Sequence, residues 1–244
     1  MKENTEDVMR ASYLAFIGRV SASLSHEIKN TLAIIGESSG LINDLFEHAP
    51  PPTDWGPYPR VKTLLTSIAQ QVNRSVTIVT RLNRFAHSMD EPLVLLELNE
   101  LLGDINNLAQ RFANLREVHL DTRLSNGTLP IQTDPFRLQQ VVFGFIDRGL
   151  QAAPKDTTVT VTSGQAEGLA QIIITDEGPS QAESIRKQIA TPQAAFEQDE
   201  EKNPVDLPTL ALIATQLGGS IEAEDLHPQG NRIILTFPLE TAQN

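Results

Sequence analysis

Apolar residues recur at spacings of three, four, seven or eight positions over the first part of the chain, from Val8 to His48. They are Phe16, Val20, Leu24, Leu32, Ile35, Ile42 and Leu45. This spacing places them on one face of a helix, and no proline interrupts the run, so it predicts one long helix. A second stripe of the same period runs from Arg60 to Met89 and predicts a second helix. Between the two, residues 49–59 contain five prolines, which indicates a loop.

Two long helices joined by a short loop form an αα-hairpin, which is the expected first part of the fold. The second stripe consists of Val61, Leu65, Ile68, Val72, Val79 and Leu82. One hairpin cannot cover both stripes fully, so we expect two hairpins to pair in a four-helix bundle. This pairing predicts a homodimer. The alternative is that the stripes pack against the second half of the same chain.

The pattern changes after Asp90-Glu91-Pro92, a segment typical of a hinge, and this change predicts two domains, residues 1–90 and 91–244. Strands are expected at 93–98, 118–124, 128–132, 157–163, 169–176, 220–224 and 232–238, and helices at 99–114, 134–153 and 207–217. Residues 178–204 are polar and are expected to be irregular. This order predicts a two-layer α/β sandwich after the hairpin, so the fold class of the whole chain is α+β.

Two local signals predict details of this second domain. Asp134 followed by Pro135 is the usual beginning of a helix, with the aspartate as N-cap and the proline in the first turn. Asn126-Gly127 lies between two expected strands and indicates a hairpin turn.

The chain has 244 residues, no cysteine and a net charge of -12. A field of this sign repels nucleic acid and anionic membranes, so neither is an expected partner. Without cysteine there is no disulfide framework and no thiolate metal site. The apolar runs 172–174 and 207–214 are far shorter than the ~20 residues of a membrane span, so no membrane insertion is expected. The polar, acidic N-terminus does not suit a secretory signal, and we expect a cytoplasmic location.

The segment Ser25-His26-Glu27-Ile28-Lys29-Asn30 brings reactive side chains together on the first helix. A neutral imidazole is a nucleophile near neutral pH, so His26 is a candidate for transient phosphorylation. The carboxylate of Glu27 can hold the ring in one tautomer and accept its proton. The amide of Asn30, one turn further along, can aim a water molecule at a bound phosphoaspartate. Alternatively, His26 is a surface histidine on a charged helix face.

This segment resembles the H-box of histidine kinases that have a dimerisation and histidine-phosphotransfer domain. The resemblance implies that His26 is the phospho-acceptor and Glu27 its acid-base partner. It also places Asn30 where the family dephosphorylates a response regulator. The motif is short, but its position in a long helix that precedes a hairpin and an α/β domain makes it specific.

The second half resembles the catalytic and ATP-binding domain of the same family, a Bergerat-type α/β sandwich. Residues 134–141 are similar to the run into its N-box helix. The family has two asparagines four positions apart in this box, one of which holds magnesium, and Gly144 and Arg148 occupy the matching positions. Glycine has no ligand atom, and arginine is a permanent cation that cannot coordinate a metal. A role for Arg148 as a phosphate clamp is the alternative.

The glycine boxes that would bind nucleotide are incomplete. Asp176 and Gly178 match the adenine-contacting aspartate and the first glycine of one box, and Ser180 replaces its second glycine. The other reading of Asp176 is a turn residue at the end of a strand. The last box should lie at 203–208, which contains no glycine. Its prolines lack amide donors, and Asp206 would repel phosphates.

We therefore expect a two-component signalling protein in which His26 exchanges a phosphoryl group with an aspartate of a response-regulator receiver domain. In this role the chain resembles the pseudokinase-type phosphorelay proteins. Such a relay requires no cofactor or metal on this chain, because the receiver brings its own magnesium. One alternative is a divergent but active histidine kinase that uses ATP and magnesium to autophosphorylate His26. Another is a response-regulator phosphatase or interaction module that uses Asn30.

Overall fold

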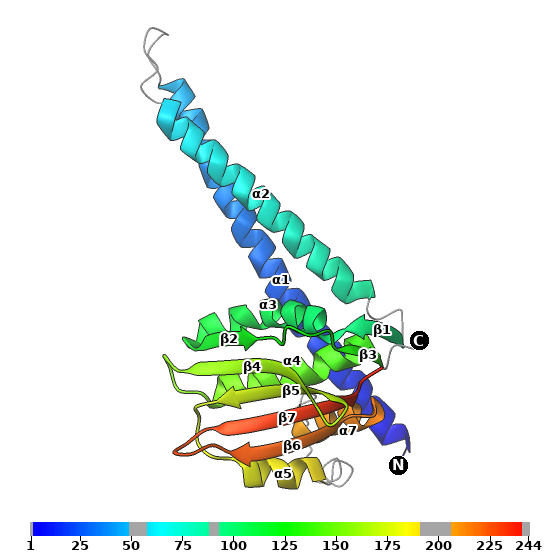
Figure 1. The fold of residues 1–244 in the computed structure, drawn as a ribbon. Helices are drawn as coiled ribbons and strands as arrows, with labels where there is room; N and C mark the ends of the chain where they lie inside the picture. Colours follow the sequence, from blue (N-terminus) through cyan, green and yellow to red (C-terminus); the bar gives the residue numbers. More distant parts are fainter. Residues whose placement is uncertain (1, 49–57, 88–92, 191–205, 241–244) are drawn as a thin grey trace. The chain divides into compact units, whose positions relative to one another are not determined.

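The computed structural model describes residues 2–48, 58–87, 93–190 and 206–240 (Figure 1). The chain forms two compact units: residues 20–86 make one, and residues 1–19 together with 87–244 make the other. We call them the hairpin unit and the α/β unit. This division differs from the predicted domains 1–90 and 91–244, because the beginning of the first helix belongs with the second half of the chain.

Both long helices predicted from the apolar stripes are present, α1 at Lys2–Glu47 and α2 at Tyr58–His87. Pro59 lies in the first turn of α2, where a missing amide proton costs no intrahelical bond. The predicted loop at 49–57 and the hinge at Asp90-Glu91-Pro92 lie outside the described residues. Among the described residues, no helix combines the length and the apolar character that crossing a bilayer requires.

The two helices of the hairpin unit face each other through a seam with heptad spacing. Its buried and half-buried members are Leu24, Ile28, Thr31, Ile35, Ser38, Ile42 and Leu45 on α1, and Val61, Leu64, Ile68, Gln71, Ser75 and Ile78 on α2. Thr31 Oγ1 and Ser75 Oγ lie 2.8 Å apart across it. We refer to this row as the inner seam.

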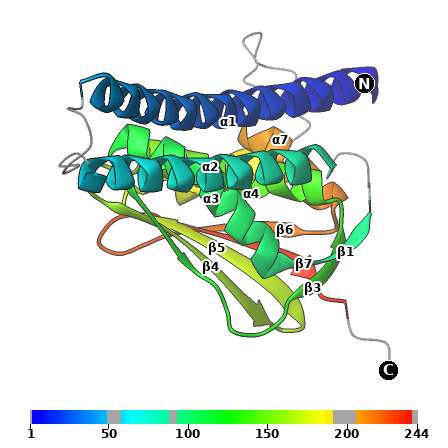
Figure 2. The same cartoon turned by 90° about the horizontal axis from the view of Figure 1, so that it is seen from above.

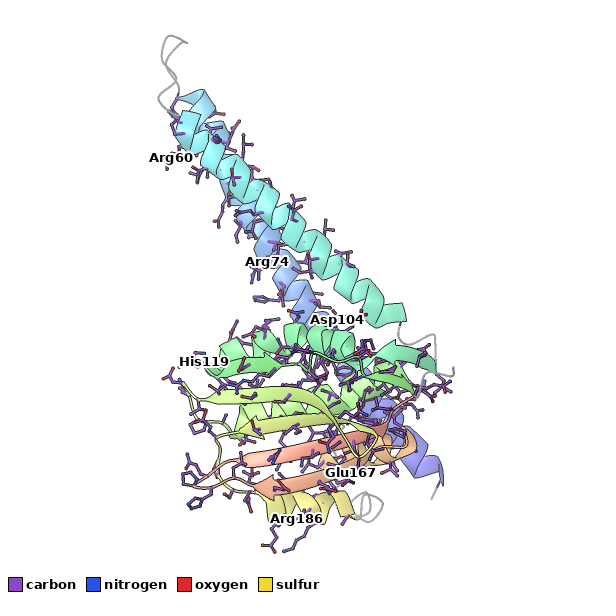
Figure 3. The ribbon with its side chains drawn as sticks, viewed as in Figure 1. Arg60, Arg74, Asp104, His119, Glu167 and Arg186 are labelled. Carbon is purple, nitrogen blue, oxygen red and sulfur yellow. The ribbon has the colours of Figure 1, made fainter. Side chains whose placement is uncertain are left out.

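Other apolar residues of the hairpin unit remain exposed. They are Leu32, Ile34 and Leu41 on α1, and Leu65, Val72, Val76 and Val79 on α2. Charged residues such as Arg60 and Arg74 take further exposed positions on α2 (Figure 3). The predicted stripes therefore divide between the inner seam and an open apolar face, which consists of Leu32 on α1 and Leu65, Val72, Val76 and Val79 on α2. Ile34 and Leu41 lie on another side of α1, about 160–180° from Leu32. A single chain leaves the open apolar face uncovered, so the four-helix bundle stays a prediction.

The α/β unit contains two sheets, and its strands agree with the predicted ones. A two-stranded sheet pairs β1 (Val94–Glu97) with β3 (Pro130–Thr133). The five-stranded sheet has the order β2-β4-β5-β7-β6. Its strands are β2 (His119–Arg123), β4 (Thr158–Ala166), β5 (Leu169–Asp176), β6 (Ser220–Asp225) and β7 (Asn231–Pro238). Only the β2–β4 pairing is parallel among these described strands, so the five-stranded sheet is mostly antiparallel.

The hairpin turn predicted at Asn126-Gly127 is wrong. β2 pairs with β4 and β3 pairs with β1, so the two strands on either side of this turn belong to different sheets. The connection is held by side chains instead: Asn99 Nδ2 donates to the carbonyl of Gly127 at 3.0 Å. Leu129 N donates to the carboxylate of Glu97 at 2.9 Å. These bonds direct the chain after β2 toward β1.

Helices α3 (Leu98–Arg116), α4 (Pro135–Ala152) and α7 (Leu207–Gln216) lie over one face of the five-stranded sheet (Figure 2). The Asp134 carboxylate accepts from Arg137 N at 3.0 Å, which confirms the predicted N-cap. Helix α5 (Ala182–Ala190) corrects the expectation that residues 178–204 are irregular. Its buried Ala182 and Ile185 are too few to create a visible stripe. Residues 191–204 lie outside the described residues.

The beginning of α1 packs into the α/β unit. The Phe16 ring lies 5.4 Å from the ring centroids of both Phe136 and Phe143 on α4. Gln140 donates a hydrogen bond to the hydroxyl of Ser12, and both side chains are buried. For this part of the first stripe, packing against the second half of the same chain is therefore confirmed.

Candidate functional site

His26 is exposed on α1, in the hairpin unit. Asn30 is also exposed, and its Nδ2 lies 3.2 Å from His26 Nδ1. The two residues are four positions apart, so they lie one above the other on the same helix face. The contact engages Nδ1, and among the described residues Nε2 has no such partner. The imidazole is thus orientated by its neighbour through one nitrogen, while the other can meet a reaction partner.

Glu27 is half-buried and follows His26 by one position, so it points about 100° away around the helix axis. Within the described part of the chain, its carboxylate makes no hydrogen bond to the imidazole. The structure therefore brings His26 and Asn30 together but not Glu27. A role for Glu27 in proton transfer stays a prediction that requires a change of its rotamer when a partner binds.

A second group of predicted residues lies in the α/β unit, around Asp176 at the end of β5. The carboxyl of Asp176 is 7% exposed and accepts hydrogen bonds from Asn231 Nδ2 at 2.9 Å and Gly178 N at 2.8 Å. Burial raises the pKa of Asp176, while these two hydrogen bonds and the charge of Arg148 act in the opposite direction. A Cβ atom on Gly178 would lie 2.6 Å from the Ala152 carbonyl oxygen, so this position requires glycine.

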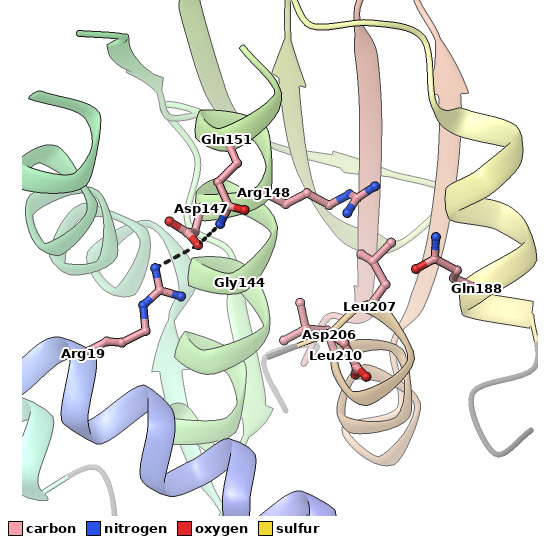
Figure 4. A pocket seen from close by; sticks show the side chains of 9 residues that line it. All are labelled: Arg19, Gly144, Asp147, Arg148, Gln151, Gln188, Asp206, Leu207 and Leu210. Atoms are coloured by element: carbon pink, nitrogen blue, oxygen red, sulfur yellow. Dashed lines mark hydrogen bonds and ion pairs between the residues drawn. The ribbon is translucent and has the colours of Figure 1, made fainter. Parts of the chain in front are cut away.

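A small cavity of about 170 Å³ lies beside this group (Figure 4). It is lined by Arg19, Gly144, Asp147, Arg148, Gln151, Gln188, Asp206, Leu207 and Leu210. These residues come from α1, α4, α5 and α7, with Asp206 as the N-cap of α7. Pockets for ligands of drug size or larger usually measure roughly 300–1,000 Å³. The cavity is therefore small for a nucleoside triphosphate.

Gly144, one of the two positions that match the asparagines of the resembling N-box, lies in a contact between two helices. A Cβ atom on Gly144 of α4 would lie only 2.5 Å from Leu210 Cδ1 of α7. Leu210 is itself buried, so its side chain fills the space that a larger residue at 144 would need. Among the described residues, no cluster of three histidine, aspartate or glutamate side chains could hold a metal ion.

Arg148 and Asp206 complete the polar lining of the cavity. Arg148 Nη2 donates to Gln181 Oε1 at 2.8 Å, and burial lowers the pKa of the guanidinium. The Asp206 carboxylate accepts from Thr209 N at 2.9 Å, so a negative charge already occupies the amino end of α7. A helix amino end is where phosphates are usually bound. Together with Gly144 and Leu210, these groups do not fit a magnesium-bound triphosphate.

A buried ion-pair group that the sequence reasoning missed lies next to the cavity. Asp147 on α4 has a side chain only 4% exposed, and its carboxylate lies 2.8 Å from Arg19 Nη2 and 3.3 Å from Arg116 Nη2. The Arg19 guanidinium also lies over the rings of Phe112 and Phe143, at 5.2 and 5.3 Å from their centroids. The only sequence signal was Asp147 itself, a charged residue within an otherwise apolar stretch of α4.

Comparisons with known proteins agree with this architecture. Residues 133–241 match the family model described as histidine kinase-, DNA gyrase B-, and HSP90-like ATPase. The description is that of ATPases, and all the matched residues belong to the α/β unit. The sensor histidine kinase ZraS of Escherichia coli O157:H7 is 29% identical over 235 residues, which are 96% of this chain and 49% of that protein.

Two further proteins extend the comparison. Sporulation kinase C of Bacillus subtilis (strain 168) is 23% identical over 230 residues, 93% of this chain and 50% of that protein. The chain thus spans about half the length of the curated relatives it matches. A crystal structure of histidine kinase ThkA in complex with response regulator protein TrrA is similar with a TM-score of 0.51 at 20% identity, covering 98% of this chain and 67% of that one. At this identity the likeness concerns the fold alone.

Proposed function

We propose, from the premise that this chain belongs to the histidine kinase family, that it acts in two-component signalling as a histidine phosphotransferase. His26 accepts a phosphoryl group from an aspartate of one receiver domain and transfers it to an aspartate of another. The observation that carries the proposal is a contrast between two sites. His26 is exposed beside Asn30, whereas Leu210 fills the space beside Gly144 that a magnesium ligand would need. The reaction belongs in the cytoplasm under this proposal.

The chemistry requires an exposed neutral imidazole. His26 Nε2 attacks the phosphorus of the aspartyl phosphate, and the N–P bond forms as the P–O bond to the aspartate breaks. The carboxylate leaves with the electron pair of that bond. For Nε2 to attack, the ring proton must be on Nδ1, so the Asn30 amide turns over and its Oδ1 accepts the Nδ1–H, in place of the Nδ2 that now lies 3.2 Å away. The Nδ1 proton then passes to water or to Glu27, and the reverse reaction charges a second receiver.

The α/β unit has a different role in this proposal. Its cavity is small, the amino end of α7 already carries the Asp206 carboxylate, and Arg148 replaces a metal ligand. We assign it to docking the receiver rather than to the transfer of phosphate from ATP. A residual adenine pocket around Asp176 and Gly178 is not required, because the bonds of Asp176 to Asn231 and Gly178 give it a structural role.

The protein acts as a homodimer in this proposal. The open apolar face of the hairpin unit includes Val76, which is 60% exposed, and Val72. When a second copy of the chain covers exposed apolar residues that repeat along two helices, their burial stabilises the dimer. A four-helix bundle of two hairpins that buries this face leaves His26 and Asn30 accessible, because they lie about 120° and 160° from Leu32 around α1.

The test compares two sources of phosphate. Purified protein is incubated with radiolabelled ATP and magnesium, and separately with a receiver domain that carries labelled aspartyl phosphate. We expect label on the chain only from the receiver, and no label in a His26→Gln variant. The control is His48→Gln, which removes another exposed histidine that follows α1 directly. Label from ATP on His26 would instead show the divergent kinase.

A second function is favoured by the contact between Asn30 and His26. An amide held beside the imidazole can also place water against a receiver's aspartyl phosphate, as a response-regulator phosphatase requires. Under this alternative, Asn30→Ala abolishes the loss of phosphate from the receiver, while His26→Gln does not. Under the relay, His26→Gln abolishes transfer and Asn30→Ala only slows it.

A further inference from the structure

One hydroxyl pair interrupts the apolar inner seam of the hairpin unit. Thr31 is 1% exposed, and its Oγ1 lies 2.8 Å from Ser75 Oγ. Thr31 Oγ1 also donates to the Ile28 carbonyl at 2.9 Å, and Ser75 Oγ to the Gln71 carbonyl at 2.9 Å. Each hydroxyl has one proton, so one of them donates within its own helix while it accepts the bond from the other helix. The two hydroxyls thus form a hydrogen-bond chain that joins α1 to α2, from one hydroxyl across the inner seam to the other and on to a carbonyl of that helix.

The pair fixes how α1 and α2 are aligned. The neighbours of Thr31 along the inner seam are Ile28 and Ile35, which offer no polar side-chain atoms. If α1 slid by one turn against α2, Ser75 would face Ile28 or Ile35 and the cross-helix bond would be lost. Polar positions in a mostly apolar helix seam are a known means of selecting one register. Here the selected register is the one that joins positions 31 and 75.

The rotation of α1 follows from the same contact. Successive residues of a helix differ by about 100°, so with Thr31 directed inward, Asn30 lies about 100° and His26 about 140° away on the same side. Both are exposed, as this geometry requires. Thr31 is adjacent to Asn30 in the sequence, so any rotation of α1 that breaks the hydroxyl pair also turns the His26–Asn30 face.

We infer that Thr31 and Ser75 are positioning residues for phosphoryl exchange at His26, a role that rests on the proposed function. Neither side chain touches the reacting atoms. Their hydrogen bond holds α1 in the register and rotation at which a receiver domain meets the imidazole and the amide of Asn30 together. The inference predicts that a large partner depends on the pair and that a small phosphodonor does not.

The experiment compares Thr31→Val, which keeps the size of the side chain and removes the hydroxyl, with the unchanged protein. Transfer from a phosphorylated receiver to His26 should fall roughly tenfold or more, because misplaced reacting groups lose rate steeply. Labelling of His26 by phosphoramidate, a small phosphodonor, should be unchanged. Thr31→Ser keeps the hydroxyl and should restore transfer to near its original rate. Thr31→Val with Ser75→Ala removes both partners and should recover part of the loss.

Thr77→Val is the matched control, since Thr77 is exposed on α2 and its hydroxyl donates only to Asn73 O, at 3.1 Å. It should leave both reactions unchanged. Equal losses with the receiver and with phosphoramidate in Thr31→Val would overturn the positioning role, as would no loss in either reaction.

A measurement that does not depend on phosphoryl transfer distinguishes a failure of this inference from a failure of the proposed function. The chain has no cysteine, so spin labels can be placed at two exposed positions through Ser39→Cys and Thr66→Cys. In samples diluted with unlabelled chain, Thr31→Val should broaden or shift the distance distribution between α1 and α2. If the unchanged protein takes no label from the receiver while this shift occurs, the relay fails and the register role stands. If transfer occurs and the distances do not change, the register role fails alone.

Discussion

The guanidinium of Arg19 on α1 lies 2.8 Å from the carboxylate of Asp147 on α4, and this ion pair joins the beginning of α1 to the α/β unit. The Asp147 carboxylate is buried, so it needs the cation more than an exposed carboxylate would. Phe112 and Phe143 lie against the other side of the guanidinium. The pair therefore combines charge, hydrogen bonding and ring contacts at one place.

We expect Arg19→Met to destabilise the α/β unit. The substitution keeps an unbranched side chain but leaves Asp147 with a single cationic partner at 3.3 Å, Arg116. Weakening the bonds of a buried charge should lower the free energy of unfolding by about 1–3 kcal/mol, measured by urea denaturation. The control is Arg123→Met, since Arg123 pairs with Asp121 on the surface and should contribute less than about 1 kcal/mol. Equal effects of the two substitutions would contradict the assignment.

Gly144→Ala should be destabilising by about 1–3 kcal/mol, because the added methyl group meets Leu210 at 2.5 Å and α4 and α7 must move apart or Leu210 must change rotamer. Leu210→Ala alone leaves a cavity and should cost about 2–5 kcal/mol. In the double variant the two changes compensate, so its loss should be smaller than the sum of the single losses. A double-mutant cycle by chemical denaturation measures this, and strict additivity would show that the two positions are not in contact.

The stability of the α/β unit should depend on pH through Asp176. Burial raises the pKa of this carboxyl above its ordinary value of 3.8, so the folded state binds its proton more tightly than the unfolded state does. Stability from this group is present below pH 3.8 and is lost as the pH rises through the folded pKa. Asp176→Asn removes the titration, so its free energy of unfolding relative to the unchanged protein should increase from pH 4 upward. Urea unfolding of both proteins at several pH values measures this difference in free energy. A difference that stays constant with pH would contradict the prediction.

The homodimer can be tested at the open apolar face. Val76→Glu places a charge where the second copy is expected, and like charges would meet across the bundle, so the dimer should dissociate at micromolar concentration. Sedimentation velocity should then report the mass of one chain instead of two. Leu95→Glu is the control, because Leu95 is an equally exposed apolar residue on β1 of the α/β unit. A monomeric unchanged protein would exclude the bundle.

Local signals in the sequence predicted most of the elements correctly. Asp134 and Pro135 begin α4 as expected, because an N-cap depends only on residues within one turn. The exposure of His26 and Asn30 follows from their place between the apolar positions of α1. Partners far apart in the sequence were harder to predict. Asn126-Gly127 is a good hairpin signal, but the side chains of Glu97 and Asn99 outcompete it through tertiary hydrogen bonds.

The contacts around the cavity could not be predicted from the sequence, because they also join residues that are far apart in the chain. Periodicity shows which face of α1 is apolar but not what covers it, so Phe16 was assigned to the dimer seam although it packs on Phe136 and Phe143. The missing metal ligand at Gly144 was visible in the sequence. The side chain that fills its place was not, because Leu210 is brought there only by the folding of α7 onto α4.

The contact of the Leu210 side chain with Gly144 also has a consequence for the evolution of this chain. If an ancestor of this chain had an asparagine at 144, restoring it now by one codon change would force the new side chain into an occupied volume. The reversal would need a smaller residue at 210 first, which by itself would weaken the packing of α7. In such a lineage, the return to asparagine at 144 would pass through a less stable intermediate.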